Sequence, residues 1–311
     1  MNKNSGQTAI IRFPPVYQYL QCHFSKLVIT RTQNAISRNP FMLLLRTPVS
    51  TYAPTSCGTV AGSSTGSAGG TAALLSDPYG VYVDSAGNVY VADYNNNRIQ
   101  KWAPGATSGI TVAGSSTGLS GVTPALLSGP NIIYVDSAGN VYVADYINNR
   151  IQKWAPGATS GITVAGSSTG SAGSTAALLS SPNGVYVDSA GNVYVADSGN
   201  NRIQKWAPGA TSGITVAGSS TGSAGSTPAL LSGPFGVYVD SAGNVYAADS
   251  NNNRIQKWAP GATSGITVAG SSTGSSNVTA GLLNYPAAVY VNSAGNVYVA
   301  DTNNNRIQKC T

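Results

Sequence analysis

A repeat of 52 residues, present five times, constrains this chain more than any other feature. The stretch from Leu74 to Gly114 reads LLSDPYGVYVDSAGNVYVADYNNNRIQKWAPGATSGITVAG. Its arginine returns at a constant spacing, without insertion, at Arg98, Arg150, Arg202, Arg254 and Arg306. Self-similarity at a period of roughly 20–50 residues is typical of solenoids, propellers and other repeat arrays. The fold therefore has to be derived from one repeat.

Each repeat predicts four short β-strands. Their boundaries in the first repeat are Gly80–Asp84, Asn88–Asp93, Arg98–Trp102 and Ile110–Gly114. The strands are rich in Val, Tyr and Ile and are separated by Gly, Asn, Asp and Ser, as strands and turns are. Both faces of the second strand are apolar, with Val89 and Val91 on one and Tyr90 and Ala92 on the other, so both faces must be covered. Four-stranded sheets stacked around an axis satisfy that condition, and this arrangement is the β-propeller.

The two ends of the repeat region predict how the ring closes. Gly58–Gly62 matches a fourth strand with no first three before it, and the last repeat stops after its third strand. We expect an all-β propeller of five four-stranded blades, closed by this N-terminal strand, which would complete the C-terminal blade and leave no free edge. The alternative is six blades, with residues 1–56 as a degenerate blade that lacks the Asp, Gly-Asn and Arg landmarks.

Charge separates the chain into a basic leader, residues 1–56, and the propeller, residues 57–311. The first 50 residues hold six Lys or Arg and no acid, whereas the rest holds ten Lys or Arg and ten Asp. The apolar run Phe41–Leu45 is too short to span a membrane. The leader has the composition of a mitochondrial transit peptide, and an unstructured extension is the alternative. A neutral propeller with interspersed charge argues against nucleic acid as a partner.

Two cysteines stand where the repeat has other residues. Cys310 takes the position of Trp102, and Cys57 takes the position of Gly109. Because these positions flank one hairpin, we predict a Cys57–Cys310 disulfide; two incidental thiols are the alternative. A disulfide implies an oxidising compartment, and Asn277-Val278-Thr279 is a glycosylation acceptor sequence. These features favour an extracellular setting, although the sequence does not decide the compartment.

The repeat resembles a known family. The pattern P-x-G-V-x-V-D-x-x-G-N-x-Y-V-A-D-x-x-N-x-R-I-Q-K, followed by I-T-V-A-G, is similar to the NHL repeat across residues 57–310. The resemblance implies a β-propeller, and such propellers often have six blades. It also implies candidate roles, because similar proteins include lyases and hydrolases that use metal-bound histidines, and ubiquitin-ligase or RNA-regulatory adaptors.

The sequence is poor in catalytic groups. His23, in the leader, is the single histidine, and there is no glutamate. A Ser–His–Asp set or a His/Cys zinc site therefore cannot be assembled within the propeller. We predict no enzymatic activity, no metal and no cofactor. Asp84 and its equivalents should accept backbone N–H groups in a turn, and Asp93 and its equivalents should brace the Asn-rich loop with the following Arg; calcium binding is the alternative.

Differences between the five repeats gather just before the first strand and in the loop between the second and third strands. In an up-and-down blade both segments emerge on one face, called here the variable face. Loops on a rigid scaffold commonly carry binding residues, so we predict a ligand-binding face; drift in exposed loops is the alternative. Its candidate residues are Asp77, Tyr79, Tyr94, Asn95, Asn131, Tyr146, Ile147, Asn183, Phe235, Asn251 and Tyr285.

Three functions follow from these observations. The first is a monomeric, non-enzymatic scaffold that binds a protein or glycan through the variable face. The second is an intracellular adaptor of the ubiquitin-ligase or RNA-regulatory type, although the chain shows no RING, B-box or coiled-coil pattern. The third is a lyase- or lactonase-like enzyme, which the lack of histidines disfavours.

Overall fold

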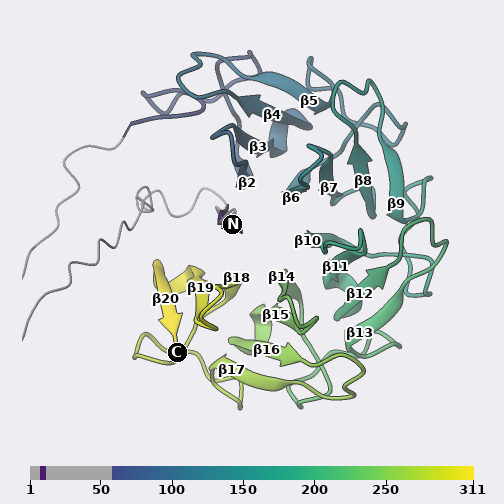
Figure 1. The fold of residues 1–311 in the computed structure, drawn as a ribbon, viewed down its shortest axis with the longest axis vertical. Helices are drawn as coiled ribbons and strands as arrows, with labels where there is room; N and C mark the ends of the chain where they lie inside the picture. The colour runs from purple at the N-terminus through teal and green to yellow at the C-terminus, as the bar shows by residue number, and fades with distance from the viewer. Residues whose placement is uncertain (1–7, 12–57) are drawn as a thin grey trace, which may run out of the picture.

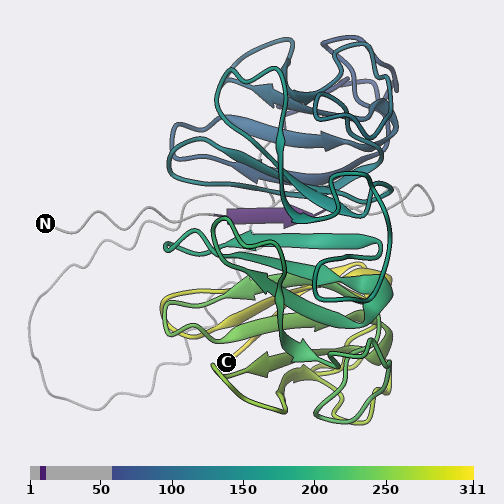
Figure 2. The same ribbon diagram turned by 90° about the vertical axis from the view of Figure 1, so that its right-hand side faces the viewer.

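The computed structural model describes residues 8–11 and 58–311 of the chain. The repeats form five antiparallel sheets arranged as blades around a central axis (Figure 1; Figure 2). The first two blades are β2 (Pro78–Val83), β3 (Val89–Asp93), β4 (Arg98–Trp102) and β5 (Ile110–Gly114), then β6 (Pro130–Val135), β7 (Val141–Asp145), β8 (Arg150–Trp154) and β9 (Ile162–Gly166). The next two are β10 (Pro182–Val187), β11 (Val193–Asp197), β12 (Arg202–Trp206) and β13 (Ile214–Gly218), then β14 (Pro234–Val239), β15 (Val245–Asp249), β16 (Arg254–Trp258) and β17 (Ile266–Gly270). The fifth blade has β18 (Pro286–Val291), β19 (Val297–Asp301) and β20 (Arg306–Cys310).

The strand prediction is confirmed, although the ends of the first two strands differ: β2 ends at Val83 instead of Asp84, and β3 begins at Val89 instead of Asn88. The first strand of the first repeat starts at Pro78 instead of Gly80, because Pro78 already pairs with Asp93. Gly87 has a φ of 82° in the turn between β2 and β3, a conformation that glycine adopts without strain. Short 3-10 turns precede the third strand in four repeats, at η1 (Tyr94–Asn96), η2 (Ser198–Asn200), η3 (Ser250–Asn252) and η4 (Thr302–Asn304).

The hydrophobic core lies between blades. One cluster joins Tyr82 and Ile99 of the first blade to Val143 and Trp154 of the second, and equivalent clusters follow at the next three junctions. Both faces of each inner sheet are thus covered, as the apolar strands predict. Trp154, Trp206 and Trp258 each belong to one of these clusters and pack between blades.

The predicted closure of the ring is wrong in this structure. Residues 58–62 form no strand, the fifth blade has three strands, and the ring is open between that blade and the first (Figure 1). The segment lies against the first blade instead: a Cβ added to Gly62 would be 3.2 Å from Leu75 Cδ1. The short strand β1 (Thr8–Ile11) pairs with the inner edge of β2, at the centre of the ring (Figure 1). The boundary expected at residues 56 and 57, and the rest of the leader, lie outside the described residues.

Among residues 8–11 and 58–311 there is no helix long and apolar enough to cross a membrane.

Candidate functional site: the variable face

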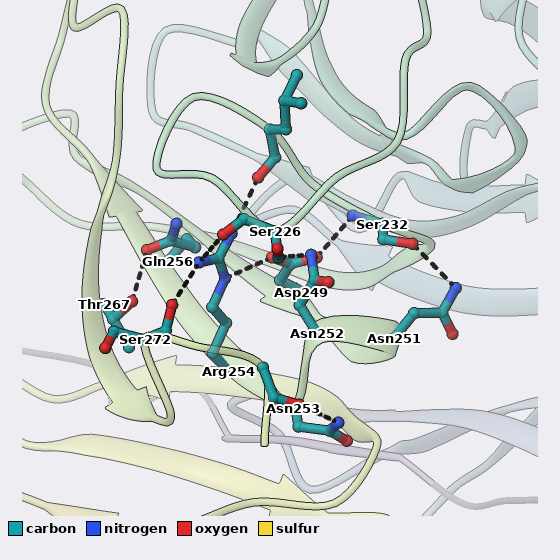
Figure 3. A network of polar contacts seen from close by, with 12 residues as sticks. Ser226, Ser232, Asp249, Asn251, Asn252, Asn253, Arg254, Gln256, Thr267 and Ser272 are labelled. Carbon is teal, nitrogen blue, oxygen red and sulfur yellow. Dashed lines mark hydrogen bonds and ion pairs between the residues drawn. The ribbon is translucent and has the colours of Figure 1, made fainter. Parts of the chain in front are cut away.

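A buried polar network fixes the loop between the second and third strands of every blade. In the fourth blade Asp249 accepts hydrogen bonds from the Ser232 backbone N–H at 2.7 Å, the Asn252 amide at 2.9 Å and Arg254 Nε at 2.7 Å (Figure 3). Burial raises the pKa of Asp249, against the opposing effect of these donors. The predicted bracing role of this aspartate is confirmed, and its oxygens are already taken by protein donors.

The opposite end of each of the first four blades carries the first aspartate of the repeat, which is Asn292 in the fifth. Asp84 accepts the Ala86 and Asn88 backbone N–H groups at 3.0 and 2.9 Å, as predicted. Burial alone would raise its pKa, but the hydrogen bonds from Asn88 and Ala86 outweigh it and lower the pKa of Asp84. Within the described residues no group of three or more His, Cys, Asp or Glu is placed to hold a metal ion.

The two variable segments of a blade lie side by side. The Asn95 backbone N–H donates to the Ser76 carbonyl at 3.2 Å, which joins the loop to the segment before β2. The rings of Tyr79 and Tyr94 then pack with their centroids 4.8 Å apart. The residues that differ between repeats thus form a surface on one face of the ring.

The segments of this face in the second and fifth blades also carry tyrosines, Tyr146 and Tyr285. Burial, with smaller contributions from the charges of Asp77, Tyr94, Tyr146 and Tyr285, raises the pKa of Tyr79 to about 12. Burial also raises the pKa of Tyr285, with a contribution from Tyr146. These groups from the first, second and fifth blades therefore lie close enough to interact electrostatically. We call Tyr79, Tyr94, Tyr146 and Tyr285 the tyrosine cluster.

One member of the cluster has a strained backbone. Tyr285 has a φ of 52°, a left-handed conformation that is uncommon for a bulky residue. Its four equivalents share the conformation: Asp77 and Ser181 have φ values of 50° and 49°, and Gly129 and Gly233 have φ values of 57° and 54°, which cost glycine nothing. The Tyr285 N–H donates to Asn253 Oδ1 of the preceding blade at 2.9 Å, and this bond holds the conformation.

A polar chain crosses the next blades near the bore. Asn131 donates to Asn183 Oδ1 at 2.7 Å, and Asn183 donates to Ser198 Oγ at 2.8 Å. Asn131 is 3% exposed, and its Oδ1 makes no hydrogen bond. A buried acceptor without a donor is costly, and a ligand N–H or O–H is one way to satisfy it. Ser198 was not among the predicted residues, although its position differs between repeats.

The remaining predicted residues are more dispersed. Ile147 is 54% exposed, Asn251 donates to Ser232 Oγ at 3.4 Å, and Phe235 is half-buried. Asn277 is exposed in the segment before β18, so its glycosylation stays a prediction. Cys310 is a free thiol in this structure, and its predicted partner Cys57 lies outside the described residues.

The repeat pattern and the propeller agree with the comparison to known families. The NHL repeat matches residues 75–102, 127–154, 179–206, 231–258 and 283–310. The chain belongs to the NHL-repeat family. No curated protein matches the chain in sequence.

Solved structures share the fold of this NHL propeller. An auxiliary nutrient binding protein from Bacteroides ovatus has a TM-score of 0.55 at 16% identity, over 74% of this chain and 58% of that one. A nidogen/laminin complex has a TM-score of 0.52 at 19% identity, over 72% of each chain. A streptogramin B lyase has a TM-score of 0.48 at 14% identity, over 75% of this chain and 65% of that one. The chain spans less than two thirds of the lyase and of the nutrient binding protein.

Proposed function

We propose that this NHL propeller is a binding scaffold without catalytic activity, which engages a protein or glycan through the variable face. The observation that carries the proposal is the tyrosine cluster, which lies where otherwise near-identical repeats differ. Tyrosine suits such a role because it offers a large, rigid ring together with a polar hydroxyl. Two proteins of similar fold are a nutrient binding protein and a member of a nidogen/laminin complex. They support the proposal by analogy alone.

The chemistry of the face favours a neutral, hydroxyl-rich ligand or an uncharged protein surface. The positions that differ between repeats include no Lys or Arg. The invariant arginines of blades one to four are at most 2% exposed, so they offer little charge to an anion. Tyrosine rings that stack on a sugar or an apolar side chain fit the general pattern of apolar sites with a few polar groups.

The test exchanges cluster residues for those of sister repeats. The full chain is screened on a glycan array and against secreted proteins, and affinity is measured for the hits. The variant carries Tyr79→Asn, Tyr146→Ser and Tyr285→Gly, three residues found at the equivalent positions of other blades. It should fold normally and bind at least about tenfold more weakly, because aromatic anchors dominate binding energy.

The matched control makes the same kind of exchange on the opposite face. Asn292→Asp restores the residue of the other four repeats and should leave binding unchanged. If the triple variant binds as tightly as the natural chain, the variable face is not the binding site. Turnover of a ligand by the purified chain would contradict the non-enzymatic assignment.

A further inference from the structure

The third strand of the fifth blade has a free edge. In each complete blade the third strand pairs with a fourth, and in the first blade the partners are Arg98 with Gly114, Ile99 with Ala113 and Gln100 with Thr111. β20 pairs with β19, and among residues 8–11 and 58–311 no strand lies on its other side. Unpaired backbone groups at a sheet edge are a template for another strand.

The free edge exposes side chains that are buried elsewhere. Ile307 is 54% exposed, whereas its four equivalents are fully buried at Ile99, Ile151, Ile203 and Ile255. The Arg306 side chain is 29% exposed, against 2% for Arg98. β20 has the sequence R-I-Q-K of the other third strands, so the difference comes from missing neighbours and not from the residues.

The chain also carries an unpaired copy of the fourth strand. Residues 59–62, T-V-A-G, are identical to residues 111–114 of β5. Val60 is 66% exposed, and the segment remains on the first blade, across the opening from β20. One molecule therefore presents both halves of a pairing that occurs four times within it, but does not join them.

Hydrogen bonds at the junctions identify further unmet partners. Asn97 donates to the Gly118 carbonyl at 3.1 Å and accepts the Gly129 N–H at 3.0 Å. The same pair of bonds recurs at Asn149, Asn201 and Asn253. Within residues 58–311, Asn305 makes neither bond. The residues one repeat before Gly118 and Gly129 are Gly66 and Asp77, and these would be the partners of Asn305 in a closed ring.

We propose that two copies of this chain exchange strands, so that residues 59–62 of each copy complete the fifth blade of the other. By the register of the complete blades, Gly62 would face Arg306, Ala61 would face Ile307 and Thr59 would face Gln308. Each copy has one free edge and one free strand, so a reciprocal exchange leaves neither edge open. The exchange replaces the monomer expected from the sequence by a dimer.

The first measurement is the mass of the full chain in solution, by light scattering after gel filtration over a range of concentrations. A particle of twice the chain mass is expected. A monomer at all concentrations would overturn the proposal, including a monomer in which residues 59–62 are protected from hydrogen exchange by pairing within their own chain.

Two variants separate the two halves of the contact. Ile307→Lys places a charge on the proposed interface, and Ala61→Pro removes a backbone N–H from the donor strand. Each should weaken the dimer by at least about tenfold. Because Ile307 is 54% exposed, its substitution should not unfold a blade. The matched control is Ile266→Lys, on the outer strand β17 at 63% exposure, which should remain a dimer.

Mixing the two variants gives the decisive result. Ile307→Lys keeps an intact donor strand, and Ala61→Pro keeps an intact acceptor edge, so the mixture can form one complete contact. Heterodimers in the mixture, with monomers in each variant alone, would support strand exchange between copies. A mixture that stays monomeric although the natural chain is a dimer would show that the dimer uses another surface, and would overturn the proposal.

Discussion

Arg150 Nε lies 2.7 Å from Asp145 Oδ2, and both side chains are almost completely withdrawn from solvent. Arg150 also donates to the Val122, Ser168, Thr123 and Leu126 carbonyls. One guanidinium thus ties the third strand to the segments that enter and leave the blade. The equivalent ion pair is present in every blade and holds its third strand to the neighbouring segments.

Replacing Arg150 by leucine should strongly destabilise the propeller. Asp145 would remain buried as an uncompensated charge, at a cost of about 3–5 kcal/mol. Thermal unfolding followed by circular dichroism measures the effect. The control is Arg306→Leu, measured under conditions where the chain is monomeric, because there the arginine is 29% exposed and the loss should be smaller. Equal losses at the two positions would argue against burial as the cause.

Replacing Tyr285 by glycine should leave the fold as stable as before or stabilise it by about 1 kcal/mol, because it relieves a left-handed conformation. Glycine keeps the backbone N–H that donates to Asn253, as Gly233 does toward Asn201. The same change should weaken ligand binding. The pair of measurements is unfolding temperature and ligand affinity; a clear loss of stability would show that the tyrosine is structural.

Acid should destabilise the turns between the first and second strands. The folded-state pKa values of Asp84 and Asp240 are lowered, so their contribution is present above the unfolded pKa of about 4 and is lost as pH falls through the folded values. Asp84→Asn keeps the turn acceptor, as Asn292 does when it accepts the Ala294 and Asn296 N–H groups. Between about pH 5 and pH 2 the variant should lose less stability than the natural chain does. An identical pH profile would mean that Asp84 does not contribute.

The predicted Cys57–Cys310 disulfide should join two chains if strands are exchanged. In the first blade a Cβ on Gly109, the equivalent of Cys57, would lie 2.9 Å from the Trp102 ring, the equivalent of Cys310. The test treats the chain with oxidised glutathione. The two thiols give up two electrons and two protons as the bridge forms, and these convert the glutathione disulfide into two molecules of reduced glutathione. A covalent dimer is then expected on a non-reducing gel, absent in Cys310→Trp. A disulfide-bonded monomer would place the bridge within one chain, and free thiols would contradict it altogether.

The sequence alone determined the blades. Each repeat has four β-prone runs, glycine turns and two aspartates at fixed positions, and these specify local structure. The strand positions, the number of blades and the roles of Asp84 and Asp93 could therefore be predicted. The inter-blade tryptophans followed from the same periodicity. The grouping of the variable loops on one face also followed, because alternating strands place every second connection at the same end.

Only the tertiary structure decided how distant parts meet. Repetition shows that residues 59–62 and β20 are complementary, but in the structure Gly62 lies against the first blade and the fifth blade keeps three strands. Likewise, Asn131 and Asn183 look like unrelated substitutions until adjacent blades bring the Asn131 amide to 2.7 Å from Asn183 Oδ1. Local sequence fixes backbone conformation, whereas these contacts depend on the angles at which separate blades pack.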